Sequence, residues 1–158
     1  MGSTPAGNTK IFMTQFVQAT SVEIEGQAVL IQGSAGVGKT SLALKLIEHG
    51  GNLICDDITV LSLKNNRIFC KVQEKLYGKI ELKGLGIIQN MAVCQEAPLA
   101  CVIRLHADKT ERFPEADQKM EILGQKIPVF DFFSCETTYL WVLYALKALK
   151  GELSLLKE

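Results

Sequence analysis

The chain has 158 residues, of which 47% are hydrophobic and 22% charged, so it is long enough for one globular domain with a sizeable core. Lys and Arg together number 17, as do Asp and Glu, and this zero net charge excludes nucleic-acid binding by bulk electrostatics. The five cysteines include no C-x-x-C pair, so we expect reduced thiols packed as small apolar groups, not a disulfide framework or a zinc site.

We expect no targeting signal in the N-terminal region. Residues 1–10 lack the charged and apolar stretches of a signal peptide, and we expect a flexible tail there, followed by a single domain over residues 11–158. Residues 11–24 are expected to be extended, with a break near Ala19 and Thr20, and residues 28–32 (AVLIQ) are typical of a buried strand. We expect a cytoplasmic protein that does not associate with membranes.

Residues 33–40 read GSAGVGKT, which is the spacing of a P-loop. Its glycines let successive backbone N–H groups cradle phosphate oxygens, and the helix expected over residues 41–48 presents its N-terminus to the same anion. The order strand, loop, helix therefore predicts a Mg²⁺–ATP site, in which Lys39 reaches the β- and γ-phosphates and the Thr40 hydroxyl holds Mg²⁺. The predicted nucleotide-binding residues are Gly33, Ser34, Ala35, Gly36, Val37, Gly38, Lys39 and Thr40.

A pair of carboxylates follows the P-loop helix. Residues 53–55 are a short apolar run that ends at Asp56 and Asp57, only 17 residues after Lys39. We expect this strand to return beside the P-loop strand and to end next to the phosphates. Adjacent residues on an extended strand end point to opposite faces, so one carboxylate can reach the Mg²⁺ shell while the other faces a substrate hydroxyl. A turn or helix-capping pair is the alternative.

Several later apolar runs predict further strands. Residues 58–63 and 68–72 flank Asn65 and Asn66, a pair suited to the turn of a hairpin. Many strands with only two clear helices predict an α/β fold with a mixed sheet, not an alternating doubly wound one. The other predicted strands cover residues 99–105, 119–123 and 127–130.

The segment IELKGLGIIQ, residues 80–89, contains a third carboxylate and two glycines. Gly84 and Gly86 permit a tight backbone path near a ligand. Glu81 offers a hard oxygen that could complete a Mg²⁺ site with Thr40. A solvated strand glutamate is the alternative.

The last predicted element is an apolar helix. We expect Ser134 to cap its N-terminus, and the helix to run through Lys150 and to end at Gly151. Its residues 139–146 are the most apolar stretch of the chain and are too short to span a bilayer. They indicate either a core helix buried on two sides or a contact between subunits.

Neither histidine fits a catalytic pattern. His49 falls at the C-terminus of the predicted P-loop helix, where a partial positive charge is favourable. His106 begins a polar segment, and we expect it to be exposed.

Taken together, these segments resemble the HPr kinase/phosphorylase family, in particular the short form that consists of the C-terminal catalytic domain only. A P-loop, the D-D pair at this short spacing and a downstream E-x-[KR]-G-x-G are together far more specific than a P-loop alone. The matching pieces run from residue 28 to residue 115 and read AVLIQGSAGVGKTSLALKLIEHG, LICDD, ELKGLGII, EAPLACVIRL and ERFPE.

The resemblance implies a P-loop core related to phosphoenolpyruvate carboxykinase. It implies ATP- and Mg²⁺-dependent phosphorylation of a serine of the phosphocarrier protein HPr, reversal of that reaction, and a hexamer. Carried over by position, Asp57 is the proton acceptor in the forward reaction and the donor in the reverse one, and Asp56 supports the metal and its waters. Thr40 and Glu81 hold Mg²⁺, and Lys39 contacts phosphate. The segment that would form a docking or catalytic loop contains Lys83, Gly84 and Gly86.

The chain departs from the family pattern in three places. It has Gln18 where the family has a functional histidine, so any acid–base role there is lost, and Lys83 where the family usually has arginine. No basic region follows Ile127. A nucleotide-binding regulatory module with weak or no catalysis therefore stays open. A small-molecule kinase is a third possibility, disfavoured because the only arginines are Arg67, Arg104 and Arg112.

Overall fold

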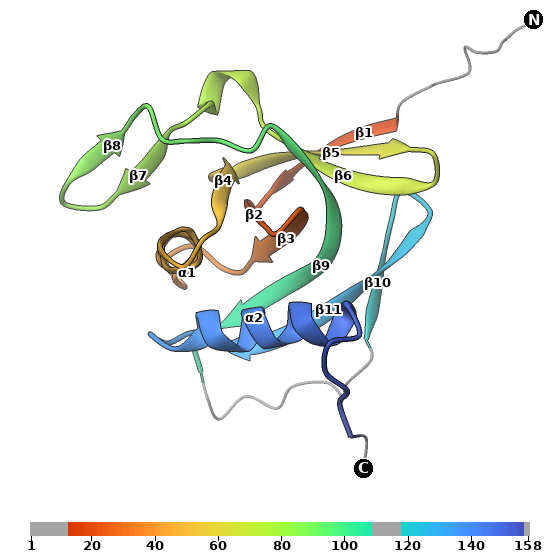
Figure 1. The fold of residues 1–158 in the computed structure, drawn as a ribbon. Coiled ribbons are helices and arrows are strands. Elements are labelled where there is room, and N and C mark those ends of the chain that lie inside the picture. The colour runs from red at the N-terminus through yellow and green to blue at the C-terminus, as the bar shows by residue number, and fades with distance from the viewer. Residues whose placement is uncertain (1–12, 109–117, 157–158) are drawn as a thin grey trace, which may run out of the picture.

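A curled sheet of mixed strand direction, covered by two α-helices, makes up the computed structural model, which describes residues 13–108 and 118–156 (Figure 1). The expected tail over residues 1–10, the first two residues of the first predicted strand, Arg112 and the motif ERFPE lie outside the described residues. An α/β fold with a mixed sheet is the architecture expected from the sequence.

The elements follow the expected order, with some boundaries moved. In chain order they are β1 (Met13–Gln18), β2 (Thr20–Ile24), β3 (Gln27–Gln32), α1 (Lys39–Glu48), β4 (Asn52–Cys55), β5 (Ile58–Lys64), β6 (Arg67–Lys71), the 3₁₀-helix η1 (Glu74–Leu76), β7 (Ile80–Leu82), β8 (Gly86–Ile88), β9 (Glu96–His106), β10 (Lys119–Ile122), β11 (Gln125–Phe133) and α2 (Thr138–Leu149). The predicted hairpin turn is confirmed, because Asn65 and Asn66 join β5 to β6 with positive φ values of 51° and 63°.

The nine-stranded sheet places the P-loop strand in its interior. Seven strands follow the order β1-β5-β6-β9-β3-β2-β4, while β11 pairs with β9 and β10 with β11. The three strands β3, β9 and β11 are mutually parallel, so their carboxyl ends meet at one edge. β9 is longer than predicted because β6, β3 and β11 all pair with it and satisfy its backbone.

The expectation that the carboxylate strand lies directly beside the P-loop strand is wrong. β2 lies between β3 and β4 and pairs antiparallel with both. β4 therefore runs parallel to β3 but one strand further away. β2 directly precedes β3 in the chain and pairs with it as an antiparallel hairpin, so β2 takes the position next to β3 and β4 pairs with β2 instead.

Two apolar clusters cover opposite faces of the central strands. Neighbouring residues Leu30 and Ile31 of β3 belong to different clusters, as the alternation of side chains along a strand requires. One cluster lies under the helices and includes Leu46 of α1 and Val142 of α2. The other lies inside the curl of the sheet, where β4, β5, β6 and β11 approach one another.

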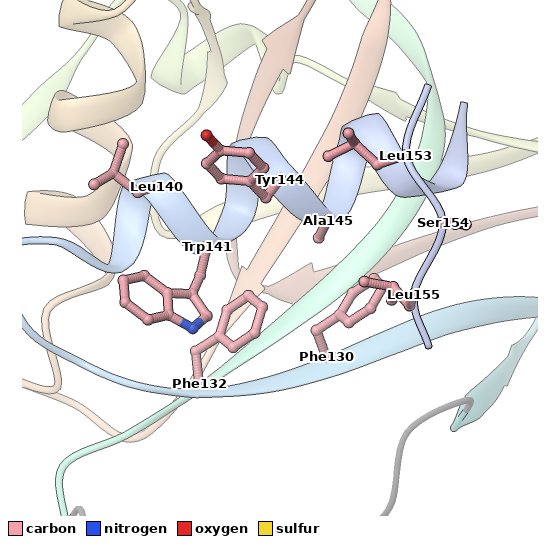
Figure 2. Close-up of a pocket in the computed structure, with 9 residues that line it drawn as sticks. All are labelled: Phe130, Phe132, Leu140, Trp141, Tyr144, Ala145, Leu153, Ser154 and Leu155. Atoms are coloured by element: carbon pink, nitrogen blue, oxygen red, sulfur yellow. The ribbon is translucent and has the colours of Figure 1, made fainter. Parts of the chain in front are cut away.

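The expectation that α2 is buried on two sides is wrong. The helix buries Val142 and Leu146 against α1 and the sheet, but it leaves Trp141 58% exposed and Tyr144 56% exposed. These two side chains and Phe132 of β11 line an apolar cavity of about 760 Å³ (Figure 2). The helix lies at the margin of the helical layer, so no further element covers its outer face within the described residues.

Candidate functional site

The P-loop joins the end of β3 to the start of α1. The helix begins at Lys39, two residues before the predicted start, with Gly38 at the N-cap and a φ of 113° that favours glycine. No side chain caps this terminus and no acidic residue lies in the first turn. The first backbone N–H groups of α1 are therefore left for an anionic ligand.

The Lys39 side chain folds back over the loop. Its Nζ donates to the Gly33 carbonyl at 2.8 Å and to the Ser34 carbonyl at 3.3 Å. A Cβ added at Gly33 would lie 2.7 Å from Val37 Cγ1 and 3.1 Å from the Leu105 carbonyl of β9. The loop therefore packs too tightly for a side chain at Gly33, and it keeps a cation at its mouth, as the P-loop prediction requires.

Ser134 anchors the P-loop and does not cap α2. Its hydroxyl donates to the Val37 carbonyl at 2.7 Å, and a Cβ at Gly38 would lie 2.8 Å from Ser134 Oγ. The predicted cap was wrong because α2 starts at Thr138, after Thr137 at the N-cap position. The connection between β11 and α2 is thereby held against the phosphate loop.

Asp56 is the centre of a hydrogen-bond cluster beside the P-loop. Its carboxylate is buried, and Oδ1 accepts the hydroxyls of Thr20 at 2.9 Å and Thr40 at 3.2 Å. Its Oδ2 accepts the backbone N–H of Glu81 at 3.4 Å. Three residues predicted from the sequence to serve one site, Thr40, Asp56 and Glu81, therefore converge although β4 is not adjacent to β3.

Asp57 is exposed, whereas Asp56 is buried. The two aspartates thus differ in burial, and the backbone between them forms a turn and not an extended strand end. The Ile58 N–H donates to the Asp56 carbonyl at 2.8 Å, and Asp57 between them has a φ of 71°, which is uncommon for a residue other than glycine. Strained conformations of this kind concentrate at functional sites.

Thr20 was not identified from the sequence. It is buried, it donates to Asp56 Oδ1, and its Oγ1 accepts the Asp57 N–H at 3.3 Å. One hydroxyl therefore holds both members of the carboxylate pair. No signal in the sequence marks it, because a threonine at the start of a strand is ordinary and its partners lie 36 and 37 residues away.

The segment with Gly84 and Gly86 forms the two-stranded hairpin β7–β8, which projects from the body of the molecule (Figure 1). Its base contacts α1, and the Glu81 and Lys83 side chains are exposed. The outer part also exposes Leu85 and Ile87, at 73% and 64%. The hairpin therefore meets the carboxylate cluster at its base, where the Glu81 N–H bonds Asp56, and carries exposed apolar side chains further out.

The oxygens beside the P-loop suit Mg²⁺. Thr40 and Asp56 present a hydroxyl and a carboxylate at the N-terminus of α1, and Mg²⁺ prefers hard oxygen ligands. Within residues 13–108 and 118–156, no group of three or more His, Cys, Asp or Glu side chains is placed to hold a metal ion. An ion here would therefore draw its other ligands from nucleotide phosphates and water, as Mg²⁺ commonly does.

Gln18 lies at the place where the resemblance requires a functional histidine. It pairs with Ile58 in the β1–β5 ladder, one residue from Asp57, and its side chain is exposed. A side chain that does not titrate therefore stands beside the exposed carboxylate.

The two histidines behave differently. His49 is structural, as expected: its Nδ1 lies 2.8 Å from the Lys45 carbonyl and its ring stacks on Tyr139. The expected exposure of His106 is wrong, because it ends β9 and its Nε2 lies 2.7 Å from Asp131 Oδ1.

Arg104 also binds Asp131, with bonds of 2.9 and 3.0 Å to its two oxygens. Burial alone would raise the pKa of Asp131, but Arg104 and His106 outweigh it and hold that pKa below the usual range.

Neither helix in the described part of the chain has the length and apolar character needed to cross a membrane.

A family model described as the HPr serine kinase C-terminal domain matches residues 10–133. Among curated proteins, the HPr kinase/phosphorylase of Malacoplasma penetrans is 30% identical over 132 residues, covering 77% of this chain and 44% of that protein. That of Mycoplasma mycoides subsp. mycoides is 33% identical over 121 residues, covering 69% of this chain and 39% of that protein.

A solved structure shares the fold. The HPr(Ser) kinase/phosphatase from Coxiella burnetii matches with a TM-score of 0.77 and 27% identity, over 87% of this chain and 93% of that one. The chain spans less than half the length of the curated relatives that it matches. Because the family model covers most of the sequence, this chain belongs to the HPr serine kinase C-terminal domain family.

Proposed function

We propose that this chain binds Mg²⁺–ATP at its P-loop and phosphorylates a serine of an HPr-type phosphocarrier protein. The observation that carries the proposal is the hydrogen-bond path from Thr40 through Asp56 to Thr20 and the exposed Asp57. It joins the phosphate-binding end of the site to an exposed carboxylate. Relatives named HPr kinase/phosphorylase support the same reaction.

Each residue near the loop takes one role in phosphoryl transfer. The backbone N–H groups at the start of α1 and the Lys39 ammonium hold the phosphates and oppose the charge of the transferred group. Bound Mg²⁺ would neutralise phosphate oxygens, held by Thr40 with Asp56 supporting it and Glu81 nearby. Asp56 is fixed by its own hydrogen bonds, so it orients Thr40 without needing to move.

Asp57 accepts the proton of the incoming serine. As the serine Oγ forms its bond to the γ-phosphorus, the bond to the bridging oxygen of ATP breaks and ADP leaves with that oxygen. The serine proton passes to the Asp57 carboxylate, whose exposure lets a protein substrate reach it. In the reverse direction the same carboxyl group returns a proton to the serine oxygen.

The acceptor is a folded protein that docks beside the β7–β8 hairpin. Leu85 and Ile87 offer exposed apolar contacts on the hairpin that carries Lys83, Gly84 and Gly86, and the base of this hairpin bonds Asp56 through the Glu81 N–H. We further propose a homo-oligomer, a hexamer by family resemblance, for which the exposed apolar face of α2 provides a contact. The five free thiols suit a reducing compartment such as the cytoplasm.

A regulatory nucleotide-binding module is the second candidate, and Gln18 favours it. A glutamine beside Asp57 cannot share or relay a proton, so transfer and its reversal would both be slow or lost while nucleotide binding persisted.

Incubation with labelled ATP, Mg²⁺ and candidate HPr-like proteins tests the proposal. We expect label on a serine of one acceptor and none on a mixture of sugars and nucleotides. Tight nucleotide binding without transfer would favour the regulatory module, and label on a small molecule alone would contradict the proposal.

A further inference from the structure

A cavity of about 480 Å³ opens between the carboxyl end of β11 and the first turns of α2. Its volume lies in the range of ligand-binding pockets, and none of the phosphoryl-transfer roles assigned above uses it, although its Trp141 also belongs to the exposed face of α2. The residues that line it are Asp131, Phe132, Phe133, Cys135, Thr138 and Trp141.

The cavity lies close to the phosphate loop. Ser134 donates its hydroxyl to the Val37 carbonyl of the P-loop at 2.7 Å, and Ser134 Oγ stands 2.8 Å from where a Cβ of Gly38 would lie. The next residue, Cys135, lines the cavity, and neighbouring Cα atoms are about 3.8 Å apart. A ligand that extends from the loop past Ser134 therefore reaches the cavity.

The arrangement of the site fixes the direction of a bound nucleotide. Thr40, Asp56 and the β7–β8 hairpin lie on the side of the loop towards β2 and β4, where the reacting phosphate belongs. The nucleoside is at the opposite end of a linear triphosphate from the reacting phosphate. It must therefore leave the loop on the side of β9 and β11, at whose carboxyl edge the cavity opens.

The walls favour stacking over hydrogen bonding. The Trp141 indole is 58% exposed and projects from α2 towards β11, beside Phe132 (Figure 2). The nearby polar groups already bind one another: the Thr138 hydroxyl donates to the Phe133 carbonyl and accepts the Cys135 N–H, both at 2.8 Å. Asp131 accepts bonds from Arg104 and His106. Few polar groups are left to read the edge of a base.

We propose that this cavity holds the aromatic base of the P-loop nucleotide, stacked against Trp141. The inference rests on the proposed nucleotide binding and adds the residue that receives the base. Because stacking uses the face of a ring that every base possesses, the site should discriminate weakly between purines. ATP and GTP should therefore bind within a few-fold of each other.

Trp141 is the single tryptophan of the chain, and it lines both this cavity and the larger one beside Tyr144, so its emission reports on this region and the variants below separate the two cavities. The intact chain is titrated with Mg²⁺–ATP, Mg²⁺–GTP and Mg²⁺–tripolyphosphate, and calorimetry measures each affinity. We expect both nucleotides to change the emission of Trp141, and tripolyphosphate to bind without changing it.

Variants separate stacking from folding. Removal of a stacking ring is worth about 1–3 kcal/mol, so Trp141→Leu should weaken ATP binding about 5- to 150-fold and leave tripolyphosphate binding unchanged. Trp141→Phe should restore most of the ATP affinity. Tyr144→Leu is the matched control, because Tyr144 is equally exposed on α2 but does not line this cavity.

The outcomes distinguish the two proposals. Equal ATP affinity in Trp141→Leu and Tyr144→Leu, while Lys39→Ala weakens binding, would overturn the base site and leave the P-loop assignment standing. A wild-type chain that binds neither ATP nor tripolyphosphate would overturn both.

Discussion

The Thr20 hydroxyl holds both aspartates of the site, so its removal should affect stability and catalysis together. Thr20→Val keeps the shape of the side chain. The bond to the Asp56 carboxylate, at 2.9 Å, has a charged acceptor and is worth about 1.5–3 kcal/mol, whereas the 3.3 Å bond from the Asp57 N–H is long and adds about 0.5 kcal/mol. We therefore expect the free energy of unfolding to fall by about 2–3.5 kcal/mol.

Urea unfolding measures this loss, and Thr59 provides the matched control. Thr59 is also buried, and its hydroxyl donates at 2.9 Å to the neutral carbonyl of Ala19 and bonds the Ser21 hydroxyl at 2.8 Å. Thr59→Val loses two neutral hydrogen bonds and should lower the free energy of unfolding by about 1–3 kcal/mol, so it matches Thr20→Val in the scale of the stability loss but touches neither aspartate side chain. Thr20→Ser, which keeps the hydroxyl, should recover most of the stability lost in Thr20→Val.

The same variants test positioning in the transfer reaction. Thr20 reaches the P-loop only through Asp56, so Thr20→Val should leave the affinity for Mg²⁺–ATP nearly unchanged. Misplacement of the two carboxylates should lower kcat by roughly 10- to 100-fold, and Thr20→Ser should restore it. If Thr20→Val matched Thr59→Val in kcat, the positioning argument would be refuted.

Three other perturbations test separate parts of the account. Lys39→Ala should weaken nucleotide binding by about 1–3 kcal/mol in calorimetry, and unchanged affinity would contradict the phosphate-binding role. Arg104 and His106 hold the pKa of Asp131 below its unfolded value. The free energy of unfolding of wild type should therefore exceed that of Asp131→Asn at neutral pH, and this advantage should shrink as the pH falls below about 4. A difference between the two that is constant with pH would contradict this expectation. Neighbouring threonine hydroxyls lower the pKa of the exposed Cys135 thiol, while burial raises the pKa of the other four cysteine thiols. Iodoacetamide should therefore label Cys135 first, as read by mass spectrometry. Labelling of another cysteine at the same rate would refute this prediction.

Features fixed by neighbouring residues could be predicted from the sequence. The P-loop spacing, the Asn65–Asn66 turn and the end of α2 shortly before Gly151, whose φ is 82°, each depend on local backbone preference. The alternation of apolar residues also identified most strands. These signals were enough to bring Thr40, Asp56 and Glu81 into one expected site.

Features that depend on strand pairing could not be predicted. Nothing in the periodicity of β2 shows that it separates β3 from β4, because a buried run has the same pattern beside any neighbour. The Ser134–Val37 bond joins residues 97 positions apart, and local reasoning assigned Ser134 to the nearest helix instead. The face of α2 that remains exposed likewise depends on where α1 and β11 lie, and an unbroken apolar run contains no such information.

Transfer to serine by wild type, Asp57→Asn and Asp56→Asn tests whether the chain is a serine kinase with Asp57 as its proton acceptor. Phosphoserine on an HPr-type acceptor is quantified by mass spectrometry with Mg²⁺–ATP in excess, and a serine-to-alanine acceptor serves as the control. We expect wild type to modify one serine and Asp57→Asn to be slower by roughly 10²- to 10⁴-fold at unchanged nucleotide affinity, because an amide cannot accept the proton. Asp56→Asn should chiefly raise the Mg²⁺ requirement. Full activity in Asp57→Asn, or an inactive wild type that binds ATP normally, would contradict the account.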